Sequence, residues 1–365
     1  MEVRDTLYII NFTAPAVTAF ICLGMILMRY GERSRYTTDT KLMKLLLGYY
    51  VTILCVSLTS FSFIYLRAIY AYVNFISTAA ILYSIVIIYH IIHSLTSTSS
   101  GKVFSFIHYL TPVMIALIQL FWSFYYLSIT DSEALYTDQW FLMVSSFKLG
   151  VWIVYGTIYS LSGLRKVIRY KKIIADYSAD EDRSSLRWLY VVIILTIALI
   201  PLTFLYVFFR NEQVLYSIFS LLVNFILQLQ LVVLAYNVFI ENYILMYPVG
   251  NYAEKRDSVP NIDKERFESL IKNEKPYLNP GLKITDLTRV MCTNRSYLSG
   301  FINKTYGMSF SRYINNCRLT ELRCLENNSK GSGYEKETLI IKAGFRSIRG
   351  YHQFIAQEKK KHGKA

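Results

Sequence analysis

The chain has few of the residues that build metal centres and disulfide frameworks. Its 365 residues include only five cysteines and five histidines, and charged residues make up only 18%. The cysteines form no C-x-x-C pair and no cysteine/histidine set with the spacing of metal ligands. We therefore expect no metal, no cofactor and no disulfide framework.

Catalytic motifs are also missing from the sequence. It contains no H-E-x-x-H and no G-x-S-x-G, and the stretch TSTSSGK lacks the first glycine of a phosphate-binding P-loop. The sequence thus names no catalytic residue, and we expect a protein that is not an enzyme.

Hydrophobic residues, in contrast, are abundant and make up 53% of the chain. A helix needs roughly 20 apolar residues to cross the bilayer core, which is about 30 Å thick. Seven runs of that length lie near 7–28, 45–65, 69–93, 103–129, 140–163, 188–209 and 213–237. The sequence predicts an all-α protein in which residues 1–247 form a seven-helix transmembrane bundle.

Loop charges predict the orientation of these spans. The loops 29–44, 94–102 and 164–187 together hold 13 lysines and arginines, whereas the N-terminus and the other loops hold three. Basic loops stay in the cytoplasm. We therefore expect a multi-pass protein of a bacterial inner membrane, with its N-terminus outside and its C-terminus cytoplasmic.

Polar side chains inside the spans are few and stand out. Lys148 lies about eight residues into the fifth run, where an unpaired ammonium would cost several kcal/mol. In a structural role, Lys148 snorkels toward the membrane surface or forms a hydrogen bond between helices. In a functional role, it contacts a lipophilic ligand or a membrane partner and serves in sensing. The uncharged polar residues are expected to hydrogen-bond between helices; they are His108, Gln119, Asn224, Gln228 and Gln230.

The C-terminal part of the chain differs in charge from the spans. From Pro248 onward there are 22 basic and 12 acidic residues, a net charge of +10 out of the total of +14. Residues 248–262 are rich in turn formers and predict a linker, so that residues 263–365 form a second domain. A basic domain of this kind is suited to a polyanion such as double-stranded DNA.

Within this domain, residues 284–306 have the pattern of a helix-turn-helix. Apolar residues mark one face of a first helix, CTN makes the turn, and Leu298 and Ile302 mark the buried side of a second helix. That second helix would present polar side chains to a major groove; these are Arg295, Ser296, Ser299 and Asn303. The same spacing also fits an ordinary helical hairpin with a solvated polar face.

Longer motifs favour DNA binding. The segments NPGLKITDL, TNRSYLSGFIN, YGMSFSRYIN and Arg318-Leu319 resemble the AraC/XylS-type DNA-binding domain. The resemblance implies a transcriptional regulator with two helix-turn-helix units joined by a long helix that opens at Arg318-Leu319. Its second unit would lie at about 335–358, where AGFRS matches the family's turn, and its DNA contacts would be Arg346, Ser347, Arg349 and His352.

The chain also departs from that family in its second unit. Ile340 stands where a small alanine is usual, and Lys336 where a buried aliphatic residue is usual. A second hypothesis therefore stays open: a seven-span sensor or carrier whose basic tail binds a protein or an anionic lipid surface. Homodimer formation is open under both hypotheses.

Overall fold

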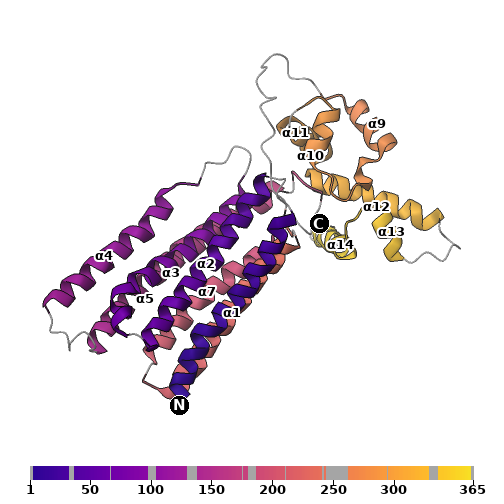
Figure 1. Cartoon of the computed structure of the whole chain (residues 1–365). Helices are drawn as coiled ribbons and strands as arrows, with labels where there is room; N and C mark the ends of the chain where they lie inside the picture. Colours follow the sequence, from indigo (N-terminus) through magenta and orange to yellow (C-terminus); the bar gives the residue numbers. More distant parts are fainter. Residues whose placement is uncertain are drawn as a thin grey trace. The chain divides into compact units, whose positions relative to one another are not determined.

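The computed structural model describes residues 3–32, 37–65, 67–97, 104–129, 138–174, 176–179, 186–209, 211–240, 242–243, 262–293, 295–328 and 336–362 (Figure 1). The chain divides into two compact units. The first, called here the bundle, comprises Met1–Thr96, Lys102–Val167 and Arg187–Glu241. The second, called the tail unit, comprises Ser97–Gly101, Ile168–Leu186 and Asn242–Ala365.

The bundle is built from long helices that lie side by side (Figure 1). They are α1 (Val3–Glu32), α2 (Thr37–Tyr65), α3 (Arg67–Thr96), α4 (Ile107–Ile129), α5 (Asp138–Ile174), α7 (Arg187–Phe208) and α8 (Gln213–Phe239). The expected all-α class is confirmed for the described residues, which contain no strand and only one isolated β-bridge.

Six of these helices are long and apolar enough to cross a membrane. The spans are Ile9–Met28, Lys41–Ser62, Tyr72–Thr96, Ile107–Tyr126, Arg187–Leu205 and Gln213–Phe239. Helix α5 contains the expected fifth span, 140–163, and is long enough at 37 residues, but it is not among the six. Lys148 and neighbouring polar residues make α5 less apolar than the other helices.

Each bundle helix packs against specific neighbours. Neighbouring pairs run from α4 through α3, α2, α1 and α8 to α7. Helix α5 closes the series, because a Cβ at Gly163 would lie 2.9 Å from Ile92 of α3 and one at Gly156 would lie 3.4 Å from Ile200 of α7. Large apolar side chains remain exposed on the outside of the bundle, Phe121 to 76%, as suits a lipid environment.

Hydrogen bonds between polar side chains cross-link the bundle helices, as expected from the sequence. Thr18 of α1 bonds Gln228 of α8 at 3.2 Å, and Gln230 of α8 bonds Thr196 of α7 at 3.0 Å. The remaining three pairs are Asn224 with Asn11, Gln119 with Asn74, and His108 with Tyr159. Each of the five polar residues predicted to link helices does so.

The tail unit is assembled from short helices. They are α9 (Lys264–Glu274), the 3₁₀ turn η2 (Pro276–Leu278), α10 (Ile284–Val290), α11 (Arg295–Tyr306), α12 (Phe310–Asn328), α13 (Lys336–Lys342) and α14 (Ile348–His362). The expected linker 248–262 lies outside the described residues apart from Ile262. Helix α12 begins at Phe310, so Arg318 and Leu319 lie in its middle and do not open it.

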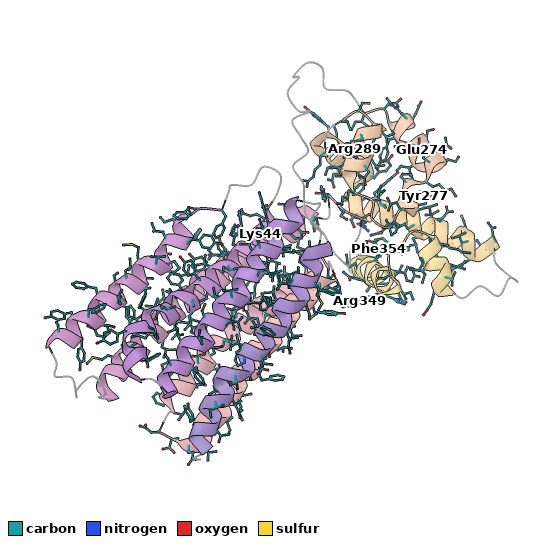
Figure 2. The ribbon with its side chains drawn as sticks, in the orientation of Figure 1. Lys44, Glu274, Tyr277, Arg289, Arg349 and Phe354 are labelled. Carbon is teal, nitrogen blue, oxygen red and sulfur yellow. The ribbon has the colours of Figure 1, made fainter. Side chains whose placement is uncertain are left out.

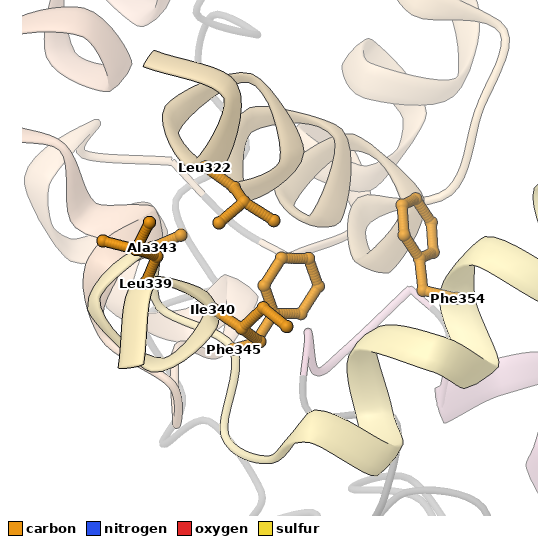
Figure 3. Packing of buried hydrophobic residues seen from close by; sticks show 6 residues of the cluster. All are labelled: Leu322, Leu339, Ile340, Ala343, Phe345 and Phe354. Carbon is orange, nitrogen blue, oxygen red and sulfur yellow. The ribbon is translucent and has the colours of Figure 1, made fainter. Parts of the chain in front are cut away.

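Two apolar cores hold the short helices together. In the first, the ring of Phe267 on α9 lies 5.4 Å from that of Phe301 and 5.6 Å from that of Tyr313. The second is formed by α12, α13, α14 and the turn between the last two (Figure 3). Its buried members are Leu322, Leu339, Ile340, Ala343, Phe345 and Phe354.

The two departures from the family fit this second core. Ile340 is 1% exposed and fills the space under α12 together with Leu322. Lys336 is exposed at the start of α13, where its ammonium lies 3.4 Å from the carboxylate of Glu326. The larger Ile340 side chain is therefore accommodated, and the lysine does not have to be buried.

Candidate nucleic-acid interface and intramembrane lysine

Helices α10 and α11 fall within the range 284–306, where the sequence pattern predicts a helix-turn-helix. Leu298 and Ile302 of α11 are completely buried, so the opposite side of that helix faces outward. On it, Tyr297 is 44% exposed, and Gly300 and Asn303 are exposed as well. The outward side of α11 thus combines small, aromatic and amide side chains that can approach a DNA groove.

Hydrogen bonds and rings fix α11 against α9. The Tyr306 hydroxyl at the end of α11 donates to the Glu268 carboxylate at 3.0 Å. Burial, together with this carboxylate, raises the pKa of Tyr306 to about 12, so the phenol stays protonated and donates at neutral pH. A helix held in this way presents its outer face in one orientation.

The predicted contact residues of α11 have different surroundings. Asn303 is exposed, and its amide donates to the hydroxyl of Ser299, which is half-buried, at 3.4 Å. The Ser296 side chain lies outside the described residues, as does Asn294, the last residue of the predicted turn CTN. Among the predicted contacts on this helix whose side chains the structure describes, Asn303 is the most open to solvent.

Arg295, the first residue of α11, is half-buried. Its guanidinium carbon lies 5.1 Å from the centre of the Tyr177 ring, within the range of a cation–π interaction. Burial lowers the pKa of Arg295 from its ordinary value, while Tyr177 and Asp176 act in the opposite direction. The sequence pattern placed Arg295 on an open surface, and its contact with a residue 118 positions earlier was missed.

The second set of predicted contacts gathers at the start of α14. Arg346, Arg349 and His352 are all exposed, and Figure 2 labels Arg349 on this helix. Ser347 has a capping role, because its hydroxyl accepts from the backbone N–H of Gly350 at 3.0 Å. The structure therefore brings three cationic or titratable side chains together on one short stretch.

Arg318 is a functional candidate that the sequence pattern did not single out for a role. It is 2% exposed, and its guanidinium donates to the backbone carbonyls of Ala179, Tyr277 and Asn279 at 2.8 to 3.0 Å. It also lies 5.9 Å from the Phe345 ring of the second core. Arg318 thus ties the backbone at positions 179, 277 and 279 to the second core and belongs to the architecture of the tail unit.

Lys148 lies in a polar cluster between α3, α4 and α5. Its ammonium donates to the hydroxyl of Ser77 at 2.6 Å and to that of Tyr70 at 3.1 Å. In the same region, Gln119 of α4 bonds Asn74 of α3, and the Gln119 amide oxygen is buried with no partner among the described residues. Lys148 therefore makes the interhelical hydrogen bonds of the structural hypothesis, in a setting that contains further polar atoms.

A second polar cluster joins α3, α4 and α5. His90 bonds the Tyr109 hydroxyl at 2.7 Å, and Lys166 lies 2.9 Å from His93. The described residues contain no group of three or more ligating side chains that could hold a metal ion. These histidines are thus engaged in packing and hydrogen bonds between helices.

Comparison with protein-family models, with curated proteins and with solved structures found no match.

Proposed function

We propose that the chain is a membrane-anchored, sequence-specific DNA-binding regulator of transcription. The observation that carries the proposal is the geometry of α10 and α11. The buried pair Leu298 and Ile302 fixes α11 so that its polar side faces outward with Asn303 exposed. A short helix presented by a preceding helix and a tight turn is the arrangement that enters a major groove.

Charge supports the same proposal. The net charge of +10 from Pro248 onward suits the phosphate backbone, which supplies much of the affinity in DNA binding. Exposed Arg349 and His352 of α14, and Arg346 just before that helix, would add phosphate or base contacts. In this proposal Arg295, Ser296, Ser299 and Asn303 contact base edges, and Ser347 holds the start of α14.

The bundle would anchor this unit at a bacterial inner membrane. We propose that α5 also crosses the membrane, which raises the number of spans from six to seven, so that the N-terminus is outside and the tail is cytoplasmic, as the loop charges indicate. Lys148 is the proposed sensing residue, because an ammonium held by neutral hydroxyls in a span can be stabilised further by an anionic group. The ligand class would be a lipophilic molecule or a membrane partner that carries a negative charge.

A DNA-binding assay on the full chain in nanodiscs tests the proposal. Duplexes are selected by the wild-type protein from a random-sequence pool, and their affinity is compared with that of unselected duplexes. We expect a selected motif, and we expect Asn303→Ala to weaken the preference for it. Failure to select any motif would contradict sequence-specific binding.

A second function is favoured by the exposed basic start of α14. There the tail would bind an anionic lipid surface, where each interfacial lysine or arginine contributes roughly 1 kcal/mol. Binding of the wild type, Asn303→Ala and the double variant Arg346→Ala/Arg349→Ala to phosphatidylserine vesicles and to DNA separates the two functions. If Asn303 contacts bases, Asn303→Ala should weaken DNA binding and leave vesicle binding unchanged. Loss of vesicle binding in a variant whose DNA selectivity is unchanged would favour the lipid function.

A further inference from the structure

Four residues between α5 and α7 belong to the tail unit by packing. We call residues 176–179 the docking segment. Tyr177, Ser178 and Ala179 are each no more than 2% exposed, although they lie about a hundred positions before α10 and α11 in the sequence. Burial of three consecutive residues outside any helix requires partners for their backbone groups.

Two of those backbone groups are paired with the strand-like stretch just before α10, while the N–H groups of Tyr177 and Ser178 bond the carbonyl of Ile174. The N–H of Ala179 donates to the carbonyl of Leu282 at 3.2 Å, and the N–H of Ile284 donates to the carbonyl of Tyr177 at 2.9 Å. Ser178 and Lys283 form an antiparallel β-bridge between these two bonds. The docking segment therefore pairs with the residues that lead into the helix-turn-helix.

This pairing also completes the start of α10. The N-cap residue, Lys283, has no side-chain acceptor, and the first N–H groups of a helix have no partner within the helix. Tyr177 supplies the carbonyl for Ile284, and the Asp286 carboxylate accepts from the N–H of Lys283 at 2.9 Å. A backbone carbonyl from another part of the chain thus satisfies the first N–H group of α10.

The same segment reaches α11 through one side chain. The ring of Tyr177 lies against the guanidinium of Arg295, the first residue of that helix. Arg318 secures the segment from the other side, because it donates to the carbonyl of Ala179 at 3.0 Å. Arg295 is thus placed by a residue that α10 and α11 do not contain.

We propose that the docking segment is a working part of the DNA-binding surface and that Tyr177 is a positioning residue, whose ring sets the direction of Arg295 for contact with DNA. This inference rests on the proposed DNA-binding function. Helix α5 runs unbroken from Asp138 to Ile174, two residues before the docking segment. A movement of α5 would therefore reach Tyr177, and through it Arg295, along a very short stretch of chain.

The docked position can be tested without DNA. Ser178 and Lys283 face each other as a non-hydrogen-bonded antiparallel pair, the geometry with the shorter Cα–Cα separation of about 4.5 Å, which suits a disulfide. In the full chain in nanodiscs, the double variant Ser178→Cys/Lys283→Cys should form an intramolecular disulfide under mild oxidation. The single variants control for the five native cysteines. Absence of the disulfide in the double variant would overturn the docking.

The positioning role is tested with the selected duplexes from the random pool. Tyr177→Phe keeps the ring and should bind as the wild type does, whereas Tyr177→Leu fills the space without a π face and should weaken binding about 3- to 10-fold. In a background of Arg295→Ala, Tyr177→Leu should cause no further loss. Thermal melting of all variants controls for folding, since a purely structural role would give equal losses with and without Arg295.

The outcomes separate this inference from the function on which it rests. Equal affinity of Tyr177→Leu and the wild type, with the disulfide formed, would overturn the positioning role and leave DNA binding intact. If the wild type selects no duplex, the proposed function and the positioning role both fall.

Discussion

Arg318 shows how a single side chain can hold together segments that lie far apart in the sequence. Its guanidinium binds carbonyls at positions 179, 277 and 279 and the amide oxygen of Asn315, all within 3.0 Å. Arginine suits this role because its planar fork carries five donors in fixed directions. The residue that the family resemblance assigned to the opening of a helix thus organises the inside of the tail unit.

Replacement of Arg318 tests this view. Arg318→Ala leaves several buried carbonyls without a donor, so we expect the tail unit to lose about 3 to 5 kcal/mol of unfolding free energy. Arg323→Ala, an exposed position on the same helix, is the matched control and should change stability little. Thermal melting followed by circular dichroism provides the measurement, and similar melting of both variants would refute the role.

Gly344 provides a second test at the residue scale. Its φ is +94°, and a Cβ there would lie 2.4 Å from the carbonyl oxygen of Tyr277. Gly344→Ala should therefore destabilise the tail unit by at least about 2 kcal/mol. Gly300→Ala in α11, where nothing lies within 4 Å, should instead stabilise it by roughly 0.5 to 1 kcal/mol. Chemical denaturation measures the unfolding free energy of both variants. A change in the same direction for Gly344→Ala and Gly300→Ala would contradict this account.

Among the helices, α5 contributes residues to both the bundle and the tail unit. It carries Lys148 on the face toward Ser77 of α3, it closes the bundle between α3 and α7, and its last residues belong to the tail unit. One helix thus combines a lysine that bonds span hydroxyls with a close approach to two neighbouring helices. Helix α5 is therefore continuous from the bundle to the residues that precede the docking segment.

The close approach of α5 predicts a position-dependent effect of side-chain size. Gly163→Leu would place a side chain where a Cβ already lies 2.9 Å from Ile92, so we expect overpacking to cost about 1 to 3 kcal/mol. Gly150→Leu on the same helix has nothing within 4 Å and should be tolerated. Melting of the two variants in detergent is the measurement. Equal melting temperatures would show that the close approach of α5 to Ile92 does not restrict side-chain size at position 163.

At the scale of the whole molecule, charge separates the two parts of the chain. The net charge is +10 from Pro248 onward and +4 before it. The excess of cations from Pro248 onward leads to a prediction about ionic strength. Six to ten phosphate contacts would lower DNA affinity about 10³- to 10⁵-fold between 50 and 200 mM salt. Arg349→Ala should reduce the slope of this dependence by about one, whereas Asn303→Ala should leave the slope unchanged. Binding titrations at four salt concentrations decide between these outcomes.

Hydrogen exchange tests whether the tail can be treated as an independent fragment. Residues 262–365 alone lack the docking segment, so the N–H of Ile284 loses its bond to Tyr177. We expect this amide to exchange slowly in the full chain and rapidly in the fragment. Equal protection in both would mean that the docking segment contributes nothing to α10.

Part of this organisation could be predicted from the sequence because it depends on local order. Apolar runs of the required length marked the helices of the bundle, and the spacing of Ile284, Leu287, Leu298 and Ile302 marked the buried sides of α10 and α11. Polar residues in the spans could be assigned to interhelical hydrogen bonds because an unpaired polar group in lipid is costly. The identity of each partner could not be assigned in the same way.

The sequence by itself determined the all-α class, the separation of an apolar part from a basic tail and the outward side of α11. It determined them because helical periodicity and charge are properties of neighbouring residues. Only the tertiary structure decided that Tyr177 meets Arg295 and that Arg318 binds Ala179, 139 positions away. Such pairs arise when the chain folds back on itself, and no local pattern of residues specifies which distant backbone carbonyl will lie within reach of a buried arginine.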